Sequence, residues 1–234
     1  MKICLFGIAG VPLGKHNVKD PRLDEAHRLV DAKKKTCVQV DVLGDEAVQD
    51  AEVIVVSEES RPDLILNDLE FIETRLGRNP PEAEKTVLTK LLAHLENGRV
   101  LSDAGLNDVE KQAIAAHSCF LTNRPVITAT PQEVAQPEAL ILRAYQGSGH
   151  ISFLTVGGKE NRAWEIKQGT TAWEAAGAIH SDIQQGFIRA EIISYDDFIQ
   201  AGGETEAKRA GKQRLETKSY VIQDYDLVNF RFNK

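Results

Sequence analysis

The chain of 234 residues contains little cysteine and no long apolar run. Its three cysteines, Cys4, Cys37 and Cys119, lie far apart and form no Cys-x-x-Cys pair. Such spacing predicts reduced thiols in the cytoplasm rather than disulfides or a redox motif. No segment approaches the roughly 20 apolar residues of a membrane helix, and no run of signal-peptide length follows Lys2. We therefore expect a cytoplasmic protein without a membrane partner.

Positive charge is not in excess, because the formal net charge is -7. A basic footprint over the whole chain is thereby excluded, and any RNA contact must come from a local patch. The six histidines show no metal-ligand spacing, and no Gly-x-Ser-x-Gly nucleophile motif occurs. The adjacent Asp196 and Asp197 are interpreted as a helix N-terminus rather than an acid–base pair. The residues thus predict no catalytic residue and no metal site.

The first part of the chain has the pattern of a small α/β core. An apolar run over residues 2–8 stops at a glycine-rich loop, and further β-branched runs occupy residues 36–44 and 51–57. These runs do not alternate cleanly, which favours a parallel sheet buried on both faces. An Asp-Pro pair predicts a helix over residues 20–30, and strand character returns at residues 125–128.

A helical arm is predicted over residues 61–117. Apolar residues recur every three or four positions, at Ile65, Leu69, Ile72 and Leu76 and again at Leu88, Leu91 and Leu95. Pro80 and Pro81 separate the two sets and forbid one continuous helix. We therefore expect an antiparallel hairpin that buries one apolar stripe against the other, followed by a shorter helix over residues 107–117.

A second domain is expected from residue 147, where a Gly-Ser-Gly linker begins. Its strand-like runs are residues 151–156, 162–166, 187–194, 219–222 and 227–232. Among them lies one convincing helix, which begins with a capping box formed by Thr171 and Glu174. A few strands around one helix predict an α+β domain.

The loop after the first run partly matches a phosphate-binding loop. Such a loop needs Gly-x-x-x-x-Gly-Lys-Ser/Thr, because the intervening amides surround the phosphates, lysine neutralises them and the hydroxyl binds magnesium. Residues 10–16 read Gly-Val-Pro-Leu-Gly-Lys-His, which is one residue short and ends in histidine. Histidine is a poor ligand for magnesium, so this loop alone indicates a weak phosphate site.

The last third of the chain carries a family resemblance. Residues 162–198 and the final stretch, Ser-Tyr-Val-Ile-Gln-Asp-Tyr-Asp-Leu-Val-Asn-Phe-Arg-Phe-Asn-Lys, resemble the C-terminal TGS domain of the YchF or Obg-like ATPase family. The resemblance implies a truncated P-loop GTPase-like parallel sheet with an inserted helical hairpin, followed by an α+β β-grasp (ubiquitin-like) TGS domain. The implied domains are 1–146, a degenerate P-loop domain with its arm at 61–117, and 147–234.

The nucleotide motifs depart from this family. The Asp-Pro-Arg-Leu-Asp stretch at residues 20–24 follows His16 almost at once, so most of the first helix and switch I are missing. The family's Asp-x-x-Gly is matched by residues 41–44, but Asp45 then adds a negative charge where phosphate would bind. Only the glutamate of the family's adenine-contacting Asn-x-x-Glu survives. The remnant site would comprise Gly10, Gly14, Lys15, Asp41, Gly44 and Glu133.

The resemblance implies a non-hydrolysing binding protein of the ribosome or of structured RNA that acts through its TGS domain. RNA-binding candidates are Arg162, Lys167 and Arg189, with Trp164 or Trp173 available to stack on a base. The alternation of side chains along a strand means that these three cations cannot all lie on one face of the sheet. Arg162 shares a face with Trp164, whereas Lys167 points to the other face.

Three alternatives remain. The first is a residual nucleotide-binding protein or slow NTPase that uses Gly10, Gly14, Lys15 and Asp41 with ATP or GTP and magnesium, although no cofactor is expected. The second is a protein-interaction module that works through the helical arm. The third, which concerns assembly, is a homodimer formed over a sheet edge left open by the missing elements.

Overall fold

The computed structural model describes residues 1–30 and 32–233, which form two compact units. The first unit contains Met1–His16 and Val40–Ser148, and the second contains Asn17–Gln39 and the chain from Gly149 on. The predicted boundary is therefore wrong for residues 17–39, which fold with the second unit. Within the described ranges, no helix combines the length and apolar character needed to cross a membrane.

The sheet of the first unit is the predicted parallel core. Its strand order is β2-β4-β1-β5-β6. The strands are β1 (Lys2–Phe6), β2 (Gly14–Asn17), β4 (Gln39–Leu43), β5 (Val53–Ser57) and β6 (Val126–Ala129). β1 pairs in parallel with β4 and β5, and β5 pairs in parallel with β6. Four consecutive residues of β5, Val53 to Val56, are fully buried, which explains why the sequence shows no polar alternation there.

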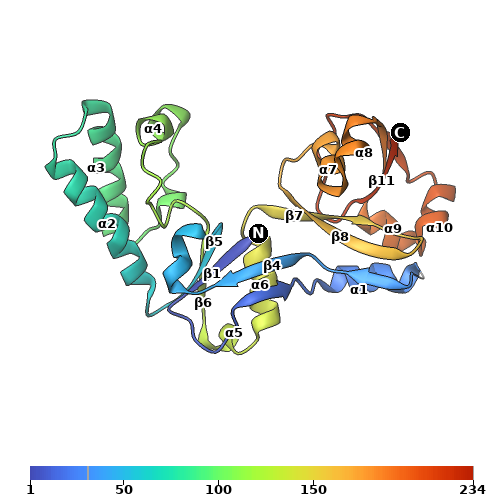
Figure 1. The fold of residues 1–234 in the computed structure, drawn as a ribbon, viewed down its shortest axis with the longest axis horizontal. Coiled ribbons are helices and arrows are strands. Elements are labelled where there is room, and N and C mark those ends of the chain that lie inside the picture. The colour runs from blue at the N-terminus through green and yellow to red at the C-terminus, as the bar shows by residue number, and fades with distance from the viewer. Residues whose placement is uncertain (31, 234) are drawn as a thin grey trace. The chain divides into compact units, whose positions relative to one another are not determined.

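The helical arm is the predicted hairpin of α2 (Arg61–Gly77) and α3 (Glu82–Glu96), shown side by side in Figure 1. Its core contains buried apolar side chains of both helices and of the loop that follows them. The Arg75 guanidinium donates two hydrogen bonds to Glu84, at 2.6 and 2.9 Å, and lowers the pKa of Glu84 to about 2. His117 contacts the same carboxylate through Nε2 at 2.9 Å. The third helix, α4 (Asp108–Ala113), is shorter than predicted.

The remaining helical segments of the first unit are short. They are η1 (Asp45–Asp50), η2 (Leu101–Asp103), α5 (Pro131–Val134) and α6 (Pro137–Gln146). In α6 the buried residues Leu140, Ile141 and Ala144 lie on one face of the helix. That apolar stripe is the pattern of a helix that covers a sheet.

The second unit is a mixed sheet with helices on both faces. Its strand order is β10-β9-β11-β7-β8-β3, and β11 and β7 run parallel. The strands are β3 (Lys34–Thr36), β7 (His150–Thr155), β8 (Glu160–Lys167), β9 (Phe187–Ile193), β10 (Arg214–Glu216) and β11 (Leu227–Phe232). The helices are α1 (Pro21–Leu29), α7 (Ala172–Ile179), α8 (Ser181–Gln185), α9 (Tyr195–Ala201) and α10 (Glu204–Arg209).

Two helix starts in this unit confirm predictions from sequence. Thr171 caps α7, and its side chain and that of Glu174 form both hydrogen bonds of a capping box. Ser194 caps α9, with Asp196 and Asp197 in its first turn. The predicted strand at 219–222 is wrong, because Val221 makes a single bridge to Thr171. β10 at Arg214–Glu216 pairs with β9 instead.

Residues 17–39 are held to the rest of the second unit by strand pairing and by ion pairs. β3 pairs in parallel with β8, so the predicted strand over residues 36–44 is split between two sheets. Asp20 caps α1, and Arg22 donates hydrogen bonds to Asp20 and to Asp224 while lying 3.7 Å from the ring centre of Tyr225. The Asp-Pro-Arg-Leu-Asp stretch thus holds α1 against the C-terminal part of the chain.

Candidate functional site

The predicted phosphate loop connects β1 to β2 in the first unit. Gly7, Gly10 and Gly14 have φ values of 64°, 88° and 103°, a region that glycine adopts without strain. Gly14 opens β2, and Lys15 lies within that strand with an exposed side chain. A phosphate-binding loop instead leads into a helix whose first amides and dipole hold the anion. Lys15 therefore lacks the position from which such a lysine reaches phosphate.

One backbone amide of this loop already donates a hydrogen bond to an acidic side chain. The Gly7 N–H donates a hydrogen bond of 2.9 Å to Asp45 Oδ1. Asp45 begins the 3-10 helix η1, directly after Gly44 at the carboxyl end of β4. Ligands of parallel sheets bind outside the carboxyl ends of the strands, so this carboxylate lies where a phosphate would approach. Its charge repels a phosphate, as the sequence predicted.

Asp41 and the loop lie at opposite ends of the sheet. In the parallel pairing of β1 with β4, Asp41 is opposite Lys2, the first residue of β1. The loop begins after Phe6, so about four residues, or roughly 13 Å, separate the two along the strand. The placement of Asp41 in a shared phosphate site is therefore wrong, because strand register brings Asp45 to the loop. Gly44 does lie near the carboxyl end, where Cys4 Sγ donates to its carbonyl at 3.5 Å.

The Glu133 side chain caps a short helix and pairs with a neighbouring arginine. Its carboxylate accepts a 2.8 Å hydrogen bond from the Thr130 N–H in a capping box of α5, and it forms an ion pair with Arg143. The Thr130 amide and the Arg143 charge keep the pKa of Glu133 below its usual value. This carboxylate is committed to capping α5, whereas Gly10 lies on the loop and Gly14 and Lys15 lie at the start of β2.

We expect Lys15→Ala to leave nucleotide binding unchanged. Lys15 lies on β2, and Asp45 holds the loop amide, so the substitution removes no phosphate contact. Calorimetric titration with ATP or GTP and magnesium should give the same heats for both proteins. Saturable binding by the parent chain that disappears in Lys15→Ala would contradict this expectation.

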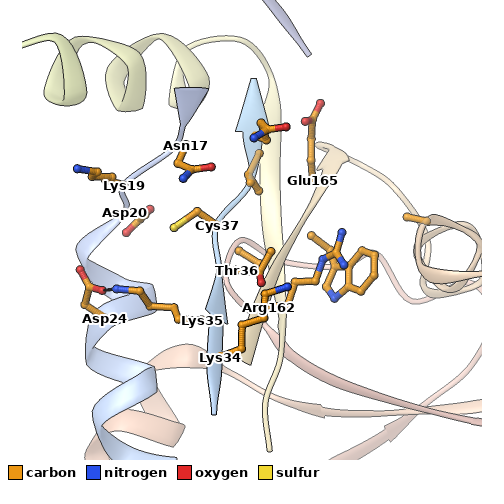
Figure 2. Close-up of a pocket in the computed structure, with 15 residues that line it drawn as sticks. Asn17, Lys19, Asp20, Asp24, Lys34, Lys35, Thr36, Cys37, Arg162 and Glu165 are labelled. Atoms are coloured by element: carbon orange, nitrogen blue, oxygen red, sulfur yellow. Dashed lines mark hydrogen bonds and ion pairs between the residues drawn. The ribbon is translucent and has the colours of Figure 1, made fainter. Parts of the chain in front are cut away.

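In the second unit, the predicted RNA-binding residue Arg162 lines a cleft of about 780 Å³. Figure 2 shows side chains of segment 17–39 on one side of this cleft and of β8 on the other. Lys34 pairs with Glu160 at 3.1 Å, and Lys35 pairs with Asp24. These carboxylates balance the cations, so the cleft does not form a basic groove.

The predicted cations do not share one face of the sheet. Arg162 lies on the face of Trp164 and Ile166, and its guanidinium stacks 3.9 Å from the Trp164 ring centre. Lys167 belongs to the opposite face of β8, and strand pairing places Arg189 on that same face. The parity limit drawn from sequence is therefore confirmed.

The two tryptophans have different surroundings. The Trp164 indole stacks on Phe153, and its N–H donates a 2.9 Å hydrogen bond to Thr155. Trp173, near the start of α7, is 40% exposed. Because Trp164 is held between Phe153 and Arg162, Trp173 is the indole that remains available for stacking.

A surface around Trp173 brings two segments of the second unit together. The Ala172 N–H donates to the Tyr220 carbonyl at 2.7 Å, and the Trp173 N–H to the Lys218 carbonyl at 3.3 Å. Exposed residues on these segments include Trp173, Glu174, Lys218, Ser219 and Val221. We call Trp173, Lys218 and Val221 the Trp173 surface. Sequence reasoning missed Lys218 and Val221, since the bridge between Thr171 and Val221 joins residues distant along the chain.

Comparisons with known proteins agree with this architecture. The family model YchF-GTPase_C, described as a protein of unknown function (DUF933), matches residues 150–233. The protein named Ribosome-binding ATPase YchF from Haemophilus influenzae is 33% identical over 233 residues, a match covering 73% of this chain and 64% of that protein. Its namesake from Haemophilus ducreyi is 57% identical over 210 residues, covering 67% and 58%. The chain belongs to the YchF family.

A solved YchF structure shares the fold of this YchF-family chain. The Schizosaccharomyces pombe YchF GTPase superposes with a TM-score of 0.77 at 19% identity, covering 99% of this chain and 97% of that one. The likeness supports a P-loop-like α/β fold for the family. The chain spans about three fifths of the length of the curated YchF relatives that it matches, namely 64% and 58%.

Proposed function

We propose that this YchF-family chain is a ribosome-associated RNA-binding protein that acts through its second unit and does not hydrolyse nucleotides. The proposal starts from the relatives, which are named ribosome-binding ATPases. The ATPase part of that name is not carried over, because the loop leads into β2 and Asp45 holds the Gly7 amide.

The second unit is proposed to be a TGS domain with the β-grasp fold. Its central strands β7 and β11 run parallel, and α7 packs on one face of the sheet through Ala172, Ala175 and Ala176. A mixed sheet that packs against a helix such as α7 is the arrangement that this name describes. The family model covers residues 150–233, which are the C-terminal part of this unit.

The Trp173 surface is the observation that carries the RNA-binding proposal. An exposed indole stacks on any base, and a neighbouring lysine neutralises a backbone phosphate. Lys218 forms no ion pair in the described part of the chain, so its charge is free for a ligand. Arg162 is assigned to positioning Trp164, whereas Lys167 and Arg189 supply positive charge on the opposite face of the sheet.

Trp173→Ala is expected to weaken binding of a single-stranded RNA oligonucleotide about tenfold, since stacking contributes ~1–3 kcal/mol per base. Fluorescence anisotropy at low salt measures this change. Lys218→Ala should also flatten the salt dependence, lowering the slope of log K against log salt by about 0.7.

The matched control replaces an exposed lysine outside this surface, Lys85→Ala. It should leave both the affinity and the salt slope as they are in the parent chain. Equal weakening by Lys218→Ala and Lys85→Ala would indicate general charge attraction and would overturn the assignment of the Trp173 surface.

A further inference from the structure

A groove lies at the base of the helical arm, within the first unit. It encloses about 660 Å³ and is bounded by the first half of α2, the end of α3, Glu58 and Thr128. Its apolar lining is Ile65, Leu66, Leu69 and Leu95. Leu66 is 49% exposed, although the neighbouring Ile65 is buried in the core of the arm. The groove therefore offers unburied apolar surface beside a rigid hairpin.

The charged residues lining this groove are mostly acidic. They are Glu58, Asp63, Glu96 and Arg61. Three carboxylates and one guanidinium give a net charge of -2 at the groove. In the described ranges none of these four side chains takes part in an ion pair or side-chain hydrogen bond. The carboxylates are thus free to meet cations of a partner.

We infer that this groove binds a basic amphipathic helix of a partner protein. An apolar side chain of that helix would pack on Leu66 and Leu69, while its lysines or arginines would meet Glu58, Asp63 and Glu96. This is the helix-in-groove mode of recognition, with apolar anchors spaced three or four residues apart. Its volume lies within the usual range of about 300–1,000 Å³ for binding pockets, enough for a few side chains.

The negative charge of the groove favours a basic protein over the other molecules that could bind there. An RNA backbone would be repelled by the three carboxylates. A second copy of this chain carries a formal charge of -7 and would meet the same repulsion. The inference concerns the helical arm and does not depend on RNA binding by the Trp173 surface.

The test uses the full chain and a synthetic helical peptide of about 18 residues, or five helical turns, with leucines on one face and lysines on the other. A matched peptide carries glutamates in place of the lysines. Fluorescence anisotropy should show saturable binding of the lysine peptide and at least about tenfold weaker binding of the glutamate peptide.

Two variants locate the site. Leu66→Asp removes an apolar contact worth ~1.5–3 kcal/mol and should weaken binding of the lysine peptide at least about tenfold. Glu58→Lys/Glu96→Lys exchanges two attractive contacts for repulsive ones and should weaken it about tenfold. The control is Glu73→Lys/Glu82→Lys, on exposed positions of α2 and α3 outside the groove. Both double variants change the formal charge from -7 by +4 to -3, so only position differs.

The inference is overturned if both double variants weaken binding equally, or if Leu66→Asp binds the lysine peptide as well as the parent chain. Displacement of the peptide by single-stranded RNA would assign the groove to nucleic acid. If the chain self-associates and the peptide reverses this association, the groove would be assigned to a second copy of the chain.

Discussion

Asp68→Ala is expected to lower the free energy of unfolding of the first unit by about 3 kcal/mol. Asp68 lies on α2 and is 1% exposed. Its carboxylate accepts hydrogen bonds from the Leu121 N–H at 2.8 Å, the Thr122 N–H at 2.8 Å and the Thr122 hydroxyl at 2.6 Å. Alanine would leave three buried donors without a partner, and each such group costs ~1–3 kcal/mol.

Urea unfolding followed by far-UV circular dichroism measures this loss. Both tryptophans, Trp164 and Trp173, belong to the second unit, so tryptophan fluorescence follows that unit separately. The fluorescence transition should stay in place in Asp68→Ala. Glu73→Ala, an exposed control on the same helix, should shift neither signal by more than about 0.5 kcal/mol. A loss below about 1 kcal/mol in Asp68→Ala would contradict the anchoring role.

Arg22→Ala is expected to destabilise the second unit by about 2 kcal/mol, toward the low side of the cost of breaking a buried pair because Arg22 is partly exposed. Arg22 makes hydrogen bonds to Asp20 at 2.7 Å and to Asp224 at 2.8 Å. Asp20 is 5% exposed, so alanine would leave a buried carboxylate without its cation. The stacking on Tyr225 would be lost as well.

For this variant the tryptophan fluorescence transition should move, because α1 packs within the second unit. Arg22→Lys should recover only part of the loss, since an ammonium cannot reproduce the planar fork of contacts. Arg28→Ala, at an exposed position of the same helix, is the control and should unfold like the parent chain. An unchanged fluorescence transition in Arg22→Ala would show that residues 17–39 do not support the second unit.

Local patterns predicted the elements that depend on neighbouring residues. The helical arm followed from leucine spacing and from two prolines, and the start of α7 followed from the Thr171 capping box. Both signals act over a few residues, so they can be read without knowledge of the tertiary structure.

Such local patterns did not predict which strands pair with each other across long sequence distances. The apolar run at residues 36–44 gives no sign that Thr36 pairs with Arg162 in one sheet while Val42 pairs with Ile3 in the other. The Asp-x-x-Gly match pointed to Asp41, but register with β1 decides which acid reaches the loop, and it brings Asp45 there.

The same limit applied to the candidate RNA site. Arg162 and Trp164 stood out as a cation beside an aromatic residue, yet they satisfy each other in the structure. Lys218 joins Trp173 only because the chain returns to the start of α7, and a backbone hydrogen bond of that kind leaves no local mark in the sequence.

Ribosome co-sedimentation tests whether the chain binds ribosomes through the Trp173 surface without a nucleotide. The full chain and the double variant Trp173→Ala/Lys218→Ala would be centrifuged with ribosomes at low salt, with and without ATP and magnesium. We expect the parent chain to pellet equally in both conditions and the double variant to stay in the supernatant. A parent chain that stays in the supernatant, or that pellets only with ATP, would contradict the proposed function.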